Sequence, residues 1–248
     1  MPTVHFLGRV VPETQLIRFT VPPVAWTDPD KGVTVSAVVQ VHDSAIDVEC
    51  QLTYEPQQIE IERLLFRVEM LVNTHVDIAS YMSGRGLTPC IEAVVLPNGE
   101  RKPLHTFDHN LAPLCTLAFS DILEMALHQE PLLALAMSDL AATIERPLLI
   151  PINCARAIEA IGHLVTPGLG DDDEARWNGL NQNLNLTPDY SRFVTKLSRG
   201  PRHGEWPERF LGNDLITARN RAWTVMNRFL EFRKCGKIPL SSPEFPLL

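Results

Sequence analysis

The sequence lacks the cysteine patterns of a disulfide-stapled or zinc-bound protein. Its five cysteines, at positions 50, 90, 115, 154 and 235, are odd in number and form no Cys-x-x-Cys pair. Disulfide frameworks and structural zinc sites need thiols at regular, paired spacing. His105-x-x-x-His109 with Asp108 has no third His or Cys nearby and is interpreted as a loop pair. The sequence therefore predicts a protein of the reducing cytoplasm with no disulfide, no metal and no other cofactor.

Targeting and membrane segments are also missing. The first residues lack the basic and apolar regions of a signal peptide. No run reaches the roughly 18 apolar residues of a membrane span, because charged residues interrupt the Leu/Ala-rich region. Gly-x-Ser-x-Gly, phosphate-loop and dinucleotide-binding motifs are absent as well. The first two absences predict no membrane partner.

Positive charge is scarce overall but concentrated in one segment. The chain has 22 Lys and Arg against 30 Asp and Glu, a formal net charge of −8. Residues 192–237 hold eleven of the cations and four of the acids, so this segment carries +7 and the remainder −15. The overall charge argues against general coating of nucleic acid. A local basic surface could still bind a polyanion or an acidic partner protein.

Alternation of apolar and polar residues predicts β structure at the start of the chain. It runs over residues 33–42 and 46–54, on either side of a polar turn at Asp43-Ser44. Such a pattern is typical of a β-hairpin. An earlier strand is predicted over 17–21, ended by Pro22-Pro23.

Helical spacing then replaces the alternation. Apolar residues three and four apart predict one long helix over 58–83, with Gly84 at its C-terminal cap. A second hairpin is predicted from strands 91–96 and 102–107, with its turn at Pro97-Asn98-Gly99.

From about residue 111 every predicted element is a helix. Pro131 fits a first helical turn, and Asn213 and Gly236 are expected to cap the two ends of the last helix. The predicted helices cover 111–128, 131–144, 151–165, 173–184, 187–198 and 214–234.

The change of period near residue 110 divides the chain in two. Residues 1–110 are predicted to form a β-rich subdomain with one long helix. Residues 111–248 are predicted to form an all-α helical bundle with a short C-terminal tail. The predicted fold class is therefore α+β.

Two places in the helical part hold candidate site residues. On the 151–165 helix, Arg156, Glu159 and His163 share one face at i, i+3 and i+7. Glu159 could accept hydrogen bonds from either neighbour and orient an imidazole or a guanidinium. A local surface salt bridge is the plainer alternative.

The second place is the segment from Tyr190 to Glu205. Its cationic and imidazole side chains are Arg192, Lys196, Arg199, Arg202 and His203. The first three share one helix face, and Gly200-Pro201 is expected to break the helix so that a loop follows. Neighbouring cations repel unless an anion compensates, so the segment is either an anion site completed by Glu159 or phosphate, or a solvated face.

The last predicted helix mixes arginines with aromatic residues. Trp223 and Phe232 flank an apolar stripe, and Arg219, Arg221 and Arg228 surround it. Aromatic rings between arginines can stack on nucleic-acid bases. At helical spacing, however, the pattern favours core packing.

The C-terminal half resembles the HEPN superfamily of helical bundles, over roughly residues 112–235. Two motifs carry the resemblance: Cys154-Ala155-Arg156-Ala157-Ile158-Glu159-Ala160, and Ser198-Arg199-Gly200-Pro201-Arg202-His203-Gly204. They are similar to the superfamily's Arg-Ala-hydrophobic-Glu helix and its Arg…His-Gly turn. The N-terminal part resembles no family that we can name.

The resemblance implies a homodimeric, metal-independent endoribonuclease of the toxin or antiviral-defence type. His203 would assist proton transfer at an RNA 2′-hydroxyl, with Arg199 and Arg202 as its catalytic partners on the phosphate. The residues expected to bind substrate or orient these groups are Lys196, Arg192, Glu159 and Arg156.

One departure from the superfamily leaves a second reading open. The catalytic pattern of the superfamily has about four to six residues between Arg and His, whereas three separate Arg199 from His203. Lys196 has the longer spacing, but an ammonium cannot hold a phosphate in a bidentate manner. The alternative is a non-catalytic HEPN-like module that binds RNA, a nucleotide or a partner protein.

Overall fold

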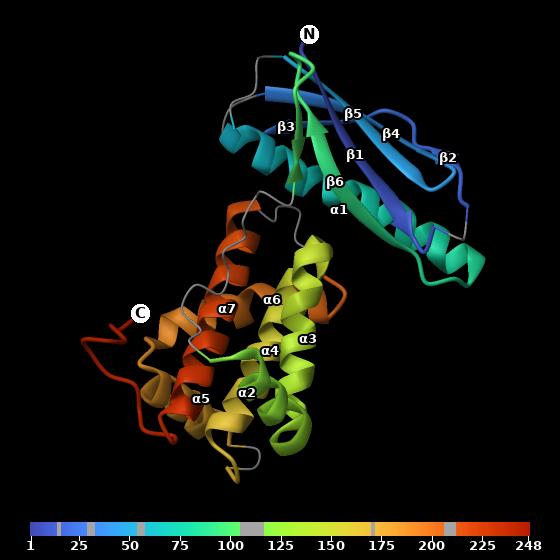
Figure 1. Ribbon diagram of the computed structural model, residues 1–248. Coiled ribbons are helices and arrows are strands. Elements are labelled where there is room, and N and C mark those ends of the chain that lie inside the picture. Colours follow the sequence, from blue (N-terminus) through green and yellow to red (C-terminus); the bar gives the residue numbers. More distant parts are fainter. Residues whose placement is uncertain (14–15, 29–32, 54–57, 105–116, 170–171, 206–211) are drawn as a thin grey trace. The chain divides into compact units, whose positions relative to one another are not determined.

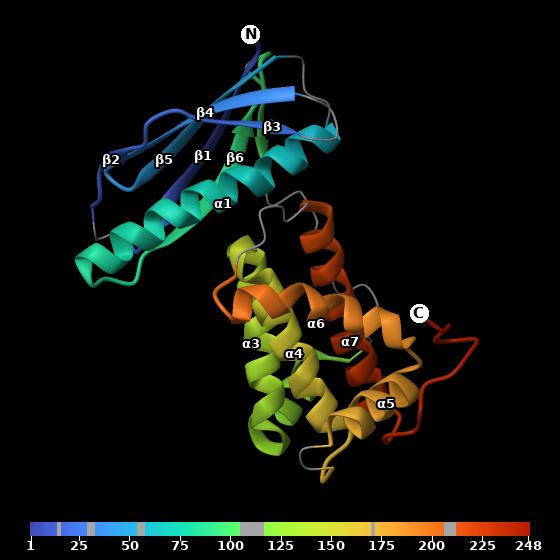
Figure 2. The same cartoon turned by 180° about the vertical axis from the view of Figure 1, so that it is seen from behind.

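The computed structural model confirms the α+β class and separates the chain into two compact units, Met1–His109 and Asn110–Leu248 (Figures 1 and 2). It describes residues 1–13, 16–28, 33–53, 58–104, 117–169, 172–205 and 212–248. The boundary that the sequence predicts near residue 110 lies outside the described residues, as do His105, Asp108 and His109.

The first unit is an antiparallel sheet with strand order β2-β4-β5-β1-β6-β7, and β3 also pairs with β4. The strands are β1 (Thr3–Val11), β2 (Phe19–Thr20), β3 (Val24–Asp28), β4 (Val33–His42), β5 (Ala45–Leu52), β6 (Thr88–Val95) and β7 (Arg101–Pro103). The predicted β4–β5 hairpin is confirmed. Its turn residues Asp43 and Ser44 both have positive φ, at 51° and 67°, as a two-residue type I′ turn requires.

The long helix α1 (Gln58–Ser83) has the bounds predicted from the sequence, and Gly84 follows it with a φ of 64°. It lies along one face of the sheet (Figures 1 and 2). Val68, Val72 and Val76 of α1 are fully buried against the inward-facing strand residues. Burial of this one stripe against one sheet face forms the core of the unit.

Several strand predictions are wrong in extent. No strand is predicted from the sequence over residues 3–11, although β1 lies between β5 and β6. Its alternation is interrupted at Gly8, where a register shift relative to β6 occurs. The strand expected over 17–21 is limited to β2, and a further strand, β3, follows Pro22-Pro23. The predicted 102–107 strand ends at Pro103.

The second unit is helical throughout its described residues, apart from its connections and tail. Its helices are α2 (Phe119–Glu124), a π-helical turn (Met125–Gln129), α3 (Pro131–Glu145), a 3-10 turn (Pro147–Leu149), α4 (Ile150–Val165), α5 (Asp173–Leu184), α6 (Pro188–Arg202) and α7 (Gly212–Lys234). Helix α4 packs against α3, α5, α6 and α7. Its residues Ala155, Ile158 and Ile161 are fully buried, so α4 is the centre of the bundle.

The stretch Pro147–Val165 is also long and apolar enough to cross a membrane by length and composition. However, 61% of its most apolar window is buried inside the structure. A buried helix at the centre of a helical bundle has the same length and apolar composition.

Three helix boundaries differ from the predictions by two residues or more. Residues 117–118 are not helical, so the first helix of this unit begins at Phe119, and residues 111–116 lie outside the described residues. Helix α6 continues four residues beyond 198. Helix α7 begins at Gly212, which places Asn213 inside the helix, so its predicted capping role is wrong.

Candidate functional site

Helix α6 places three cations on one exposed face. Its apolar and small side chains point inward: Val194 is fully buried, and Ser191 and Ser198 are 2% and 1% exposed. Pro188 and Asp189 occupy the first turn, where a missing N–H and a negative charge are both favourable. Arg192, Lys196 and Arg199 lie on the exposed side. The predicted one-sided distribution of these cations is thus confirmed.

The end of α6 differs from the sequence prediction. Gly200-Pro201 does not break the helix, which continues to Arg202. Two backbone hydrogen bonds close the last turn: Glu205 N donates to Gly200 O at 2.9 Å, and Gly204 N donates to Pro201 O at 3.3 Å. Gly204 has a φ of 76°. This is a Schellman motif, in which the residue of positive φ ends the helix one turn after the proline.

Gly200 is needed at this helix end for a steric reason. A Cβ built on Gly200 would lie 2.7 Å from the carbonyl oxygen of Glu205. The chain after the helix folds back over Gly200, and any side chain there would displace it.

The longer helix changes the position of His203. At the C-cap of α6, His203 follows Arg192, Lys196 and Arg199 at i+11, i+7 and i+4. The four side chains form a stripe about 16 Å long on one helix face. We call it the α6 basic stripe. None of its four side chains forms an ion pair or a hydrogen bond with any described residue.

Arg202 points away from this stripe toward α4. Its Nη1 and Nη2 atoms donate to Glu159 Oε1 at 2.7 Å and Glu159 Oε2 at 3.1 Å. The side chains are 29% and 37% exposed. Pairing of Glu159 with a cation of this segment is therefore confirmed, and the cation is Arg202. Both terminal nitrogens of the Arg202 guanidinium thus bind the Glu159 carboxylate, and these are the donors that two-point binding of a phosphate would need.

Arg156 is not part of that pair. Its Nε lies 3.3 Å from Oδ2 of Asp139 on α3. The local Arg156–Glu159 bridge considered as the alternative is therefore absent, because each side chain pairs with a different helix. Burial raises the pKa of Asp139, and the charge of Arg156 opposes that rise. His163 is exposed on the same face of α4.

Most other cations of residues 192–237 have structural roles. Arg228 is 4% exposed and donates to the carbonyl oxygens of Leu184, Asn185 and Pro246 at 2.9, 2.7 and 2.6 Å. Burial lowers its pKa. These bonds hold the C-terminal tail and the α5–α6 turn against α7.

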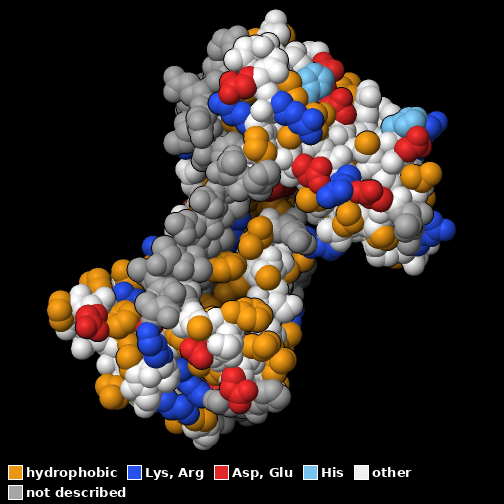
Figure 3. Space-filling view, in the orientation of Figure 1, with side chains coloured by type: hydrophobic (Ala, Val, Ile, Leu, Met, Phe, Trp, Pro, Cys, Tyr) orange, Lys and Arg blue, Asp and Glu red, His pale blue; other side chains and the backbone are white. Residues whose placement is uncertain are grey.

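The remaining arginines of α7 are similarly engaged. Arg233 pairs with Glu130 at the start of α3. The Arg221 guanidinium lies over the rings of Tyr190 and Phe193, at 4.8 and 4.6 Å from their centroids. Arg219 is buried. The face in Figure 3 shows only scattered cations among apolar side chains of the helical unit. The excess charge of the segment is therefore divided. Several of its cations have partners within the bundle, whereas the three cations of the α6 basic stripe and Lys237 are exposed and form no ion pair with a described residue.

The expected core packing of the last helix is confirmed. Ala222, Val225 and Phe229 are fully buried, and Phe232 is 2% exposed. These aromatic and aliphatic side chains face the bundle.

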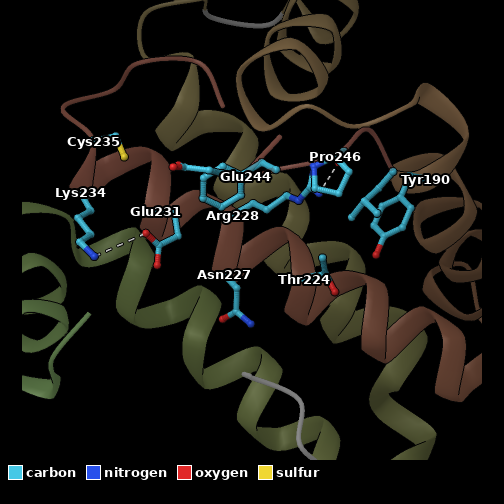
Figure 4. Close-up of a pocket in the computed structure, with 11 residues that line it drawn as sticks. Tyr190, Thr224, Asn227, Arg228, Glu231, Lys234, Cys235, Glu244 and Pro246 are labelled. Carbon is cyan, nitrogen blue, oxygen red and sulfur yellow. Dashed lines mark hydrogen bonds and ion pairs between the residues drawn. The ribbon is translucent and has the colours of Figure 1, made fainter. Parts of the chain in front are cut away.

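Sequence reasoning missed a pocket of about 730 Å³ between α7 and the C-terminal tail (Figure 4). The tail was predicted only as a short extension. Its three prolines and the apolar residues Leu240 and Phe245 were the available signal for a packed segment. Leu240 N donates to Asn183 O at 2.8 Å, which ties the tail to α5.

No group of three or more His, Cys, Asp or Glu side chains that could hold a metal ion occurs among the described residues. Burial raises the pKa of Cys50 and Cys154 to about 12, so these thiols stay protonated near neutral pH. Cys90 and Cys235 are exposed.

Comparison with known proteins places both units in one family. Residues 4–105 match the family described as "Domain of unknown function (DUF8168) N-terminal domain", and residues 118–234 match its C-terminal domain. No curated protein and no solved structure matches the chain. The two matches cover most of each unit in the expected order, and the chain therefore belongs to the DUF8168 family.

Proposed function

We propose that this protein is an RNA-binding module whose contact surface is the α6 basic stripe. One observation carries the proposal. Arg192, Lys196 and Arg199 are exposed on one helix face and have no acidic partner among the described residues. Other cations of residues 192–237 have visible partners. Arg202 and Arg233 bind carboxylates, Arg228 binds carbonyl oxygens, and Arg221 lies over aromatic rings.

Electrostatics favours a phosphate backbone as the partner. Three unpaired cations spread along about 10 Å of helix can contact successive phosphates of one strand. The stripe has no large apolar side chain at its exposed positions, which argues against a protein interface with a hydrophobic centre. The setting that we propose is cytoplasmic, consistent with an odd number of cysteines and no Cys-x-x-Cys pair.

The test is binding of a fluorescent single-stranded RNA of twelve nucleotides, measured by anisotropy over a range of salt concentrations. For three phosphate contacts we expect log K to fall with log salt at a slope of about −2. A variant with Arg192, Lys196 and Arg199 each changed to Gln should lose this slope and bind at least about tenfold more weakly at low salt.

A matched control removes the same charge elsewhere. Arg85, Arg101 and Lys237 are exposed, and changing all three to Gln should leave RNA binding within about twofold. Equal losses in the two triple variants would show that net charge, not the stripe, determines binding, and the proposal would fail. Absence of binding by the wild type at low salt would also reject it.

The second candidate function is the metal-independent endoribonuclease that the HEPN resemblance implies. It is supported by the position of His203 at the C-cap of α6, one turn after Arg199. A histidine there could move a proton from a 2′-hydroxyl while Arg199 contacts the phosphate. In this candidate the protein acts as a homodimer with a composite site.

Incubation with mixed RNA in EDTA tests the nuclease. Cleavage that persists in EDTA and is lost in His203→Ala supports it, and light scattering should then give a dimer mass. Salt-dependent binding without cleavage leaves the RNA-binding module as the function.

A further inference from the structure

The pocket between α7 and the C-terminal tail is a second candidate site, independent of the α6 basic stripe. Its volume of about 730 Å³ is within the range of small-molecule sites. Helix α7 lines it through a face that includes Thr224 and Asn227, and the tail lines it through Phe245 and Pro246. Tyr190 of α6 lies at one end (Figure 4). Three separate parts of the helical unit therefore form the site.

The charged side chains that line the pocket balance one another. Glu231 and Glu244 are matched in number by Arg228 and Lys234, so these four side chains carry no net charge. Glu231 Oε2 lies 3.9 Å from Lys234 Nζ, and both side chains have further interactions. A charged ligand therefore finds no unmatched counter-charge in the lining to compensate for the loss of its hydration.

The guanidinium of Arg228 is not available to an anionic ligand. Its Nη1 atom donates to the carbonyl oxygens of Leu184 and Asn185, and its Nη2 atom donates to that of Pro246. An anion could bind this guanidinium only by breaking the hydrogen bonds that hold the tail against α7. Carbonyl oxygens that lose their donor in a buried place destabilise the protein.

The aromatic end of the pocket disfavours a cation. The guanidinium carbon of Arg221 already lies 4.8 Å from the centroid of the Tyr190 ring. A cationic ligand on the same ring would be repelled by Arg221. An uncharged aromatic ring can still stack on Tyr190 or pack against Phe245.

Thr224 supplies a hydrogen-bond acceptor near this end. Its Oγ1 atom donates to the carbonyl oxygen of Asn220 at 2.9 Å, so the hydroxyl proton is used and the lone pairs of the oxygen can accept. Figure 4 shows Thr224 on the same side of the pocket as Tyr190. A hydroxyl or N–H group of a ligand can therefore donate to Thr224 while the ligand packs against the aromatic end.

We propose that this pocket binds an uncharged small molecule that has an aromatic body and one hydrogen-bond donor. The body packs against Tyr190, Phe245 and Pro246. The donor binds the hydroxyl oxygen of Thr224. The bound molecule connects α7 to the tail.

Four probes of similar shape test the ligand class on the full chain: 4-phenylbutan-1-ol, its methyl ether, 4-phenylbutylamine and 4-phenylbutanoate. Calorimetry at neutral pH should give the alcohol a Kd at least about tenfold lower than those of the charged amine and acid. The ether lacks the donor and should bind about three- to tenfold more weakly than the alcohol.

Alkylation of cysteine tests the place of binding. Cys235 lines the pocket, Cys90 belongs to the first unit, and both thiols are exposed. A saturating concentration of the alcohol should slow the reaction of Cys235 with iodoacetamide and leave that of Cys90 unchanged. Mass spectrometry of the two peptides measures both rates in one sample.

A pair of matched variants tests the role of Thr224. Thr224→Val should weaken binding of the alcohol about three- to tenfold and leave binding of the ether unchanged. Thr74 on α1 is the control, because its Oγ1 atom makes the same kind of bond, to Met70 O at 2.9 Å. Thr74→Val should change the Kd of neither probe.

Three results would overturn the proposal. The first is a Kd for the amine or the acid equal to or below that of the alcohol. The second is an alcohol Kd that Thr224→Val leaves unchanged, or that both variants raise equally. The third is alkylation of Cys235 that the alcohol does not slow.

Discussion

Arg202 on α6 and Glu159 on α4 form a two-point ion pair, with Nη1–Oε1 and Nη2–Oε2 distances of 2.7 and 3.1 Å. The residues are 43 positions apart, and their pairing fixes the C-terminal end of α6 against the central helix of the bundle. It also neutralises the one arginine of the helix end that lies off the α6 basic stripe. The pair therefore bears on both stability and charge.

Glu159→Gln should release Arg202 as an additional cation. If the α6 basic stripe binds RNA, the salt slope should steepen by about 0.7 and the affinity should rise. The free energy of unfolding in urea should fall by less than about 1 kcal/mol, because the pair is partly exposed.

Glu174→Gln removes the same charge from α5 without contacting Arg202, and should change neither the slope nor the affinity appreciably. A weaker RNA affinity in Glu159→Gln would mean that Glu159 positions Arg202 for binding and does not mask it. An unchanged affinity would mean that Arg202 does not reach the RNA.

Gly200→Ala should destabilise the end of α6. The new Cβ would lie 2.7 Å from the Glu205 carbonyl oxygen, so the chain after the helix must move. We expect a loss of about 1–3 kcal/mol in the free energy of unfolding. Gly86→Ala is the matched control, since a Cβ there has no neighbour within 4 Å. Equal stability of the two variants would contradict the close approach.

Arg228→Met should detach the C-terminal tail. The methionine retains apolar bulk but leaves the carbonyls of Leu184, Asn185 and Pro246 without the donors they now have. We expect a loss of about 2–4 kcal/mol. Hydrogen exchange should be faster at the Leu240 amide, which donates to Asn183 O, and unchanged in α1 of the other unit. Protection at Leu240 equal to that of the wild type would show that the tail is held by other contacts.

Asp139 should make stability depend on pH. Burial raises its pKa in the folded protein above the ordinary value of 3.8. The folded state therefore binds this proton more tightly than the unfolded state, and the contribution of Asp139 to stability falls as pH rises from 3.8 through the raised pKa.

Asp139→Asn removes that titration. The stability of the variant relative to the wild type should increase as pH rises through this window, as measured by urea unfolding at several pH values. Parallel curves for the two proteins would show that the interaction with Arg156 offsets the burial of Asp139.

Local patterns in the sequence were sufficient for most of the elements. The bounds of α1 and the β4–β5 turn were predicted correctly because side-chain periodicity and turn residues act over a few positions. β1 was missed because Gly8 interrupts its alternation. The sequence predicts too early an end for α6, because proline is expected to break a helix. The position of the helix end also depends on the packing of the Glu205 backbone over Gly200, and that contact cannot be read from the proline alone.

The sequence by itself determined the α+β class, the long helix, and the presence of Arg192, Lys196 and Arg199 on one helix face. It could not determine which of the eleven cations in residues 192–237 reach solvent. Only the tertiary structure decided that Arg202 pairs with Glu159 and that Arg228 serves three carbonyls. The physical reason is that these partners come from other helices and the tail, so their positions depend on packing and not on spacing along the chain.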